Sequence, residues 1–116
     1  IYQHFRGSYR MDKEKAKLIE SLQRYKKQAE RKAKIDKLLL FGSRARDKAS
    51  KTSDVDLLLI SNSFKGKKYF KRASKFYYLW DLPYNVDIIC LTPEEVMEKK
   101  KQAGVIQEAI KEGIEI

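Results

Sequence analysis

Apolar runs of four residues lie at Leu38–Phe41 and Leu57–Ile60, and no apolar run in this sequence exceeds five residues. Runs of this length fit β-strands and fall far short of the roughly 20 apolar residues that span a bilayer. The chain has 116 residues, which by the usual size of domains is enough for one hydrophobic core. We therefore expect one domain built around a small sheet, without a membrane association.

Apolar residues with a helical period predict helices on both sides of the runs. A helix is expected over 12–34, and a second over 68–82 before Pro83. Thr92, Pro93 and Glu95 form a helix-start pattern, which predicts a helix to about residue 101 and a last one over 105–112. The stripes that face the core are expected at Leu18, Leu22, Tyr25 and Ala29, and at Tyr69, Ala73, Phe76 and Trp80.

Strands are expected over 35–41, 54–61 and 84–91, with a short edge strand at 114–116. The resulting order of helices and strands predicts the α/β (α+β) class: a small mixed β-sheet with helices packed on it. Met11 suggests that residues 1–11 are an N-terminal extension or derive from expression, and that 12–116 form the single domain.

The charge of the chain is strongly positive, with 26 Lys and Arg against 16 Asp and Glu, a formal +10. Residues 61–76 contain six basic side chains and no acidic one. Such a segment is typical of a solvated helix face, of a surface that contacts nucleic acid, or of a contact with an acidic partner protein. The sequence leaves these three interpretations open.

A single cysteine, Cys90, and a single histidine, His4, exclude an internal disulfide and a zinc site built from several Cys or His residues. The N-terminus has no apolar segment of signal-peptide length. We therefore expect a cytoplasmic protein, with Cys90 as a core residue of its strand.

Three carboxylates stand where strands are otherwise apolar. Asp54 and Asp56, two residues apart at the start of a strand, point to the same face, and Asp87 interrupts a later strand. Charges in such places need a compensating cation, and carboxylates suit Mg²⁺ held together with substrate phosphates. The group is typical of a phosphoryl-transfer site in which Asp87 also accepts the proton of an attacking hydroxyl.

A glycine–serine turn, Gly42–Ser43, ends the first strand ten residues before the paired aspartates. Glycine lets the backbone approach a ligand closely, and backbone N–H groups with a serine hydroxyl can hold phosphate oxygens. Arg44, Arg46 and Lys48 add positive charge on the same loop.

Phe41-Gly42-Ser43-Arg44-Ala45-Arg46, followed by Ser53-Asp54-Val55-Asp56-Leu57, resembles the DNA polymerase β nucleotidyltransferase superfamily. It is most similar to the minimal nucleotidyltransferase (MNT) domains, often encoded beside a HEPN-domain partner. The resemblance covers about residues 35–91. It implies a polymerase-β-like fold, a mixed sheet with helices on one side. The sequence departs from the branch pattern at Asp47, where a glycine is usual.

Carried over residue by residue, the resemblance implies that Asp54, Asp56 and Asp87 are catalytic and bind two Mg²⁺ ions, with Mn²⁺ as an alternative. It implies that the nucleotide triphosphate is bound around the glycine–serine turn and the loop that follows, by Gly42, Ser43, Arg44, Arg46 and Ser53. An acidic residue at 47 would either weaken phosphate binding or cap the next turn.

The function implied is transfer of a nucleoside monophosphate, AMP from ATP, to a hydroxyl on a HEPN partner protein, in the role of an antitoxin. Two alternatives remain open at this stage. The chain would be an antitoxin that masks its partner without catalysis, or a basic module that binds nucleic acid through its lysine-rich segments.

Overall fold

The computed structural model describes residues 9–47, 49 and 53–116, and side chains from residue 13 onward. Four strands form one sheet in the order β3-β2-β1-β4. They are β1 (Lys37–Phe41), β2 (Val55–Ile60), β3 (Val86–Leu91) and β4 (Ile114–Glu115). Strand β1 runs antiparallel to β2 and β4, whereas β2 and β3 are parallel. The mixed sheet expected from the sequence is therefore confirmed.

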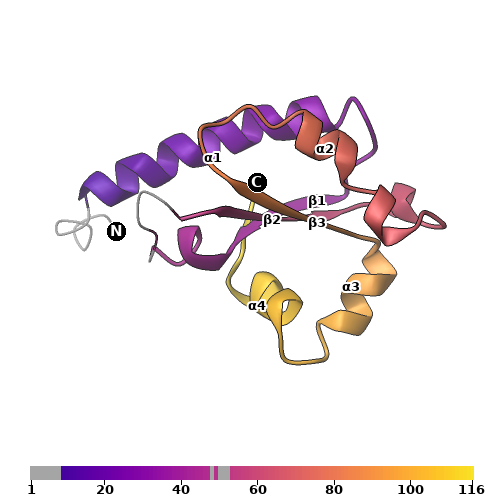
Figure 1. Cartoon of the computed structure of the whole chain (residues 1–116). Coiled ribbons are helices and arrows are strands. Elements are labelled where there is room, and N and C mark those ends of the chain that lie inside the picture. The colour runs from indigo at the N-terminus through magenta and orange to yellow at the C-terminus, as the bar shows by residue number, and fades with distance from the viewer. Residues whose placement is uncertain (1–8, 48, 50–52) are drawn as a thin grey trace.

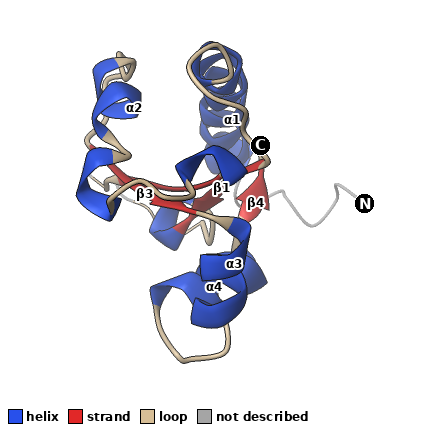
Figure 2. Ribbon diagram, turned by 90° about the vertical axis from the view of Figure 1, so that its right-hand side faces the viewer, coloured by secondary structure: helices blue, strands red, loops and turns tan. Residues whose placement is uncertain are grey.

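Helices cover both faces of the sheet, so the expectation of helices on one side was wrong. α1 (Tyr9–Ala29) and α2 (Ser74–Tyr78) lie on one face, and α3 (Pro93–Lys99) and α4 (Val105–Glu112) on the other (Figures 1 and 2). The cause is visible in the apolar runs of β1 and β2. A strand that is apolar at consecutive positions has two faces to bury, and each needs a covering layer.

Alternate residues of the two central strands supply two hydrophobic cores. Leu38, Leu40, Leu57 and Leu59 pack in the core beneath α1 and α2, while Leu39 and Leu58 pack in the core with Val96 of α3 and Ala109 of α4. β2 lies between its pairing strands β1 and β3, and the two helical layers cover its two faces. This places the start of β2, with its acidic residues, at a fixed edge of the sheet.

The predicted stripe on the first helix is confirmed, because Leu18, Leu22, Tyr25 and Ala29 are all buried. Tyr25 also donates a 2.7 Å hydrogen bond to the Phe76 carbonyl, which ties α1 to α2. The helix ends at Ala29 rather than at residue 34. The chain turns there because Ile35 returns to the core. α1 begins within the predicted extension, of which residues 1–8 lie outside the described part.

The helix predicted over 68–82 is mostly absent. The segment forms a 3₁₀ turn, η4 (Tyr69–Lys71), and then the short α2. Phe76 is buried as expected, but Tyr69 is exposed. The break comes where Arg72 turns inward to bind Glu95 of α3, at 2.6 Å. A contact across 23 residues of sequence thus overrides the local helical period.

The helix-start pattern at Thr92 is confirmed. The Thr92 hydroxyl accepts a hydrogen bond from the Glu95 backbone N–H, and the Glu95 carboxylate accepts one from the Thr92 N–H. α4 follows after Gly104 and ends at Gly113, after which β4 pairs with β1. Within the described part of the chain, no helix has both the length and the apolar character needed to cross a membrane.

Candidate active site

Asp56 and Asp87 lie side by side on neighbouring strands. They are partners in the parallel register of β2 and β3, so their Cα atoms are one strand spacing apart, about 4.8 Å. Register partners in a parallel pair point to the same face of the sheet. Asp54 lies two residues before Asp56, directly ahead of β2. The structure therefore brings the three predicted carboxylates to one edge of the sheet.

The electrostatics of this edge centre on Asp56, which is half-buried, whereas Asp54 and Asp87 are exposed. Loss of solvent raises the pKa of the Asp56 carboxyl above its ordinary value, and the negative charges of Asp87 and Asp54 raise it further. The ionised form of the Asp56 carboxyl is thus disfavoured at this position. A cation placed among these oxygens would remove the repulsion that causes part of the shift.

These residues suit a hard cation in their chemistry, because all three supply carboxylate oxygens. Across the residues that the structure describes, no three Asp, Glu, His or Cys side chains already converge closely enough to hold a metal ion. The observation that favours a cation is therefore the crowding of charge around Asp56 and not a preformed cage.

Gly42 lies directly against Asp56. It follows β1, whose last residue, Phe41, is the register partner of Asp56. A Cβ atom on Gly42 would overlap the Asp56 carboxylate, and the backbone has φ = +76°, a conformation that side chains disfavour. Only glycine therefore satisfies both requirements. Gly42 and Ser43 begin the 3₁₀ turn η2 (Gly42–Arg44), beside the carboxylates.

Residues 22–116 match the nucleotidyltransferase domain family. This chain belongs to that family. The matched segment includes the whole sheet, the turn at Gly42 and the three aspartates. The edge described above is thus the candidate active site of a nucleotidyltransferase domain.

A solved structure from Sulfolobus solfataricus, provisionally described as a nucleotidyltransferase, has a similar fold. It is 21% identical in sequence, with a TM-score of 0.67, over 90% of this chain and 84% of that one. At this identity the likeness concerns the fold. No protein of curated function matches this sequence significantly.

Arg44 joins three segments of the nucleotidyltransferase site. Its Nε and one terminal nitrogen donate hydrogen bonds of 3.1 and 2.8 Å to the Ser53 carbonyl, directly before Asp54. Its guanidinium also lies over the ring of Tyr84, with 4.6 Å to the ring centroid. Arg44 therefore holds the turn after β1 against the segments that lead into β2 and β3. The predicted Ser53 is part of this contact through its backbone.

Arg46 is placed differently, against α4. Its guanidinium forms ion pairs with Glu108 at 3.1 Å and Glu112 at 3.7 Å, all with exposed side chains. The predicted basic positions of the loop are thus divided between the site and α4. Lys48 lies outside the described residues.

The backbone conformation explains why Asp47 can occupy a position of the motif where glycine is usual. Its φ is +61°, the left-handed region that glycine adopts most easily and that aspartate tolerates better than most residues. Its carboxylate pairs with Lys15 of α1 at 2.8 Å, and the same lysine donates to the Ala45 carbonyl at 2.9 Å. The acidic charge at position 47 is therefore compensated by a lysine of α1.

Sequence reasoning missed Tyr84 and Lys15, which support the loop from other elements. Tyr84 precedes β3 as one of seven tyrosines, and Lys15 is one of many lysines of α1. No local pattern distinguishes either residue. Their roles depend on contacts across 40 and 32 positions of sequence.

Proposed function

We propose that this domain transfers a nucleoside monophosphate, AMP from ATP, to the hydroxyl group of a separate acceptor. The observation that carries the proposal is the register of Asp56 and Asp87 across β2 and β3, with Gly42 against Asp56. Paired carboxylates beside a glycine–serine turn fit the chemistry of phosphoryl transfer, in which positioning and charge neutralisation do most of the work.

Asp54 and Asp56 would hold the divalent cation that the reaction needs, with Asp87 at the acceptor side. Mg²⁺ is the ion that suits three carboxylates and a triphosphate, with Mn²⁺ as an alternative, and two ions would share the site. When bound, such ions neutralise the charge that develops on the phosphate oxygens. The charge crowding around Asp56 supports this assignment.

Asp87 would accept the proton of the attacking hydroxyl. It is the exposed partner of the pair and lies on β3, an outer strand of the sheet in the order given. As the acceptor oxygen bonds to the α-phosphorus, the bond from that phosphorus to the bridging oxygen breaks, and pyrophosphate leaves. The proton from the hydroxyl passes to the Asp87 carboxylate.

The turn at Gly42 and Ser43 would bind the triphosphate, because it lies beside Asp56 and has a backbone that a ligand can approach. Arg44 would support this segment by holding Ser53 and Tyr84, since its guanidinium already contacts both. Arg46 would bind the nucleotide only by exchanging its ion pairs with α4 for phosphate oxygens.

The acceptor that we propose is a hydroxyl of a HEPN-domain partner, so that the domain acts as an antitoxin by modifying that partner. The support is the family resemblance of the motif.

The decisive experiment uses ATP labelled at the α-phosphate, Mg²⁺, and the neighbour-encoded partner. We expect label on the partner, none after chelation of Mg²⁺, and none with Asp54→Asn and Asp56→Asn combined. Asp36→Asn is the matched control, because Asp36 caps the turn at Asn62 beyond the far end of β2. Label transfer that survives the double variant would overturn the assignment.

Neutralisation separates catalysis from masking. A folded variant with Asp54, Asp56 and Asp87 all changed to Asn should bind the partner and fail to neutralise it. Full neutralisation by that variant would show instead a non-catalytic antitoxin.

A further inference from the structure

The segment from Lys65 to Tyr78 presents aromatic rings to solvent. Phe70 and Tyr69 of η4 are 74% and 52% exposed, and Tyr78 and Tyr77 of α2 are 89% and 42% exposed. Large exposed rings gathered within ten residues are unusual on a domain surface and mark a contact with another molecule. A continuous helix would have turned Tyr69 toward the core. Tyr69 is exposed because the helix is interrupted at Arg72.

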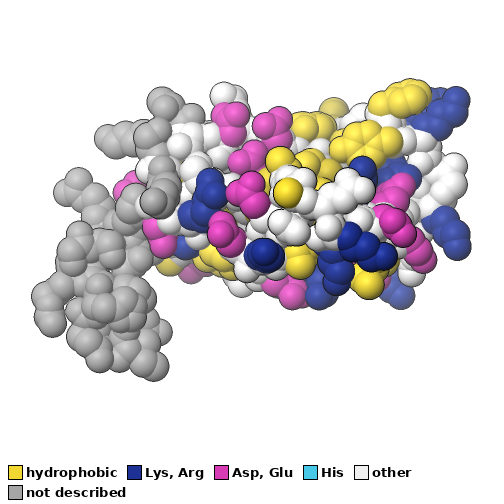
Figure 3. Space-filling view, turned by 90° about the horizontal axis from the view of Figure 1, so that it is seen from below, with side chains coloured by type: hydrophobic (Ala, Val, Ile, Leu, Met, Phe, Trp, Pro, Cys, Tyr) yellow, Lys and Arg dark blue, Asp and Glu magenta, His cyan; other side chains and the backbone are white. Residues whose placement is uncertain are grey.

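Lysines flank the η4 rings along the chain. Lys65, Lys67, Lys68 and Lys71 are all exposed, and residues 61–76 contain no acidic side chain. At the right-hand end of the face seen from the α3 and α4 side, hydrophobic and basic side chains lie next to one another, with acidic side chains beside them (Figure 3). We call Lys65–Tyr78 the aromatic–basic surface.

The η4 end of this surface lies away from the candidate active site. Asp56 lies at the start of β2, whereas η3 (Asn62–Phe64) and η4 follow the end of β2, roughly 16 Å further along the strand direction. Figures 1 and 2 place α2 on the side of the sheet where β3 lies. The α2 end returns toward the site, because the Tyr77 hydroxyl accepts a hydrogen bond of 2.9 Å from the backbone N–H of Ile88, next to Asp87.

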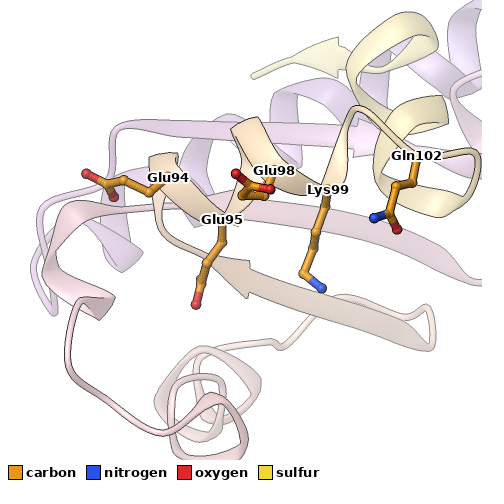
Figure 4. Close-up of a pocket in the computed structure, with 5 residues that line it drawn as sticks. All are labelled: Glu94, Glu95, Glu98, Lys99 and Gln102. Carbon is orange, nitrogen blue, oxygen red and sulfur yellow. The ribbon is translucent and has the colours of Figure 1, made fainter.

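Acidic side chains of α3 border the η4 end of the surface. Glu94, Glu95 and Glu98 line a pocket of about 360 Å³ with Lys99 and Gln102. In Figure 4, Glu95 points to a different side from Glu94 and Glu98, and Glu95 is the residue that Arg72 neutralises. A negatively charged ligand would accordingly follow η4 and α2 and stay clear of the outer side of α3.

We propose that the aromatic–basic surface binds single-stranded nucleic acid. Rings that stack on bases, interleaved with lysines that contact the phosphates, are the means by which proteins hold single strands without reading their sequence. A protein partner fits less well, because lysine is depleted at the centre of protein interfaces, and here lysines separate the rings. This proposal does not depend on the proposed transferase activity.

The test is fluorescence anisotropy of the full chain with labelled 15-residue oligouridylate and oligothymidylate, over a series of salt concentrations. We expect affinity to fall as salt rises. Phe70→Ala combined with Tyr78→Ala should weaken binding about tenfold for each ring that stacks. The matched control is Met97→Ala with Ile110→Ala, two exposed apolar residues of α3 and α4.

Charge is tested by changing Lys65, Lys68 and Lys71 to Gln. The slope of log affinity against log salt should fall by about 0.7 for each phosphate contact removed. Changing the exposed Lys17, Lys101 and Lys111 to Gln makes the same change in net charge elsewhere and should leave binding within about twofold.

Three results would overturn the proposal: no binding of either oligomer at low salt, equal losses in the control variants, or displacement of the oligomer by polyglutamate as effectively as by unlabelled polyuridylate. The last would show an acidic protein partner. Tighter binding of oligouridylate would identify the natural ligand as RNA, and tighter binding of oligothymidylate would identify it as DNA. Circular dichroism of each variant establishes that it is folded.

Discussion

The carboxylate of Asp56 occupies the space that a side chain at position 42 would need. The Asp56 Cγ lies 3.2 Å from where a Cβ atom on Gly42 would be placed, and the nearer carboxylate oxygen would overlap it. The absence of a side chain at the end of β1 therefore determines where the central carboxylate of β2 can lie.

Gly42→Ala should lower the free energy of unfolding by about 2–3 kcal/mol, from the cost of a positive φ together with the overlap. Nucleotide transfer should fall as well, since Asp56 must move. Urea denaturation measures the stability. Gly66→Ala is the matched control, because Gly66 has φ = +80° and no neighbouring atom within 4 Å of the added methyl. Equal losses in the two variants would contradict a specific role for the Asp56 contact.

Asp56→Asn should stabilise the protein at pH 7 in the absence of divalent cations, although it should abolish transfer. The folded state raises the pKa of the Asp56 carboxyl above its ordinary value of 3.8. The wild-type protein therefore loses stability as the pH rises from 3.8 through the folded pKa, because this carboxyl ionises. Thermal unfolding of both proteins with chelator from pH 3 to 8 tests this. A stability difference that does not grow with pH in that range would refute it.

Asp87→Asn should slow transfer by about 10²–10⁴-fold, the usual contribution of a positioned base. It should also lower the pKa of Asp56, because one of the charges that raise it is removed. Carboxyl NMR titration of Asp56 reports the second effect independently of activity. An unchanged titration would mean that the two residues do not interact as their register implies.

Glu95→Gln should reduce stability at pH 7 by about 1–2 kcal/mol, a value discounted for the partial exposure of Glu95. Hydrogen bonds from Arg72, and then from Thr92, lower the pKa of Glu95 from 4.5 to about 2. This contribution is present above pH 4.5 and is lost as the pH falls toward 2. Thermal unfolding across that range measures it. Glu98→Gln, on the exposed side of α3, should change little at any pH.

Arg44→Lys should slow transfer by about ten- to a hundredfold while the domain remains folded. Lysine keeps the charge but cannot reproduce the two hydrogen bonds to Ser53 together with the contact on Tyr84. Arg46→Lys is the matched control and should have a smaller effect, because its ion pairs are exposed. Steady-state transfer rates of the two variants make the comparison. Equal slowing would assign both residues the same role.

The central part of the fold could be predicted because its signals are local. The stripe on α1, the apolar runs of β1 and β2 and the cap of α3 at Thr92 each depend on neighbours within about four residues along the chain. The three aspartates could be grouped because their strands were recognised. Their common edge follows from the parallel pairing of β2 with β3.

The missed features depend on residues that are far apart in sequence. Arg72 belonged to a basic segment with three open interpretations, yet it is buried and bonded to the Cys90 carbonyl and to Glu95. Nothing within four residues of Arg72 indicates these partners. The same is true of Asp47, whose left-handed backbone and contact with Lys15 explain why this loop can accept an acid where glycine is usual.

The position of β3 beside β2, with β1 on the other side, also governs the direction from which molecules reach the site. Asp56 lies on a central strand, with Phe41 and Asp87 as its register partners on the two neighbouring strands. Asp87 stands on β3, the outermost strand of the described sheet. In the proposed reaction, the acceptor hydroxyl would therefore reach Asp87 from the open side of the sheet, whereas Asp56 would stay between two strands.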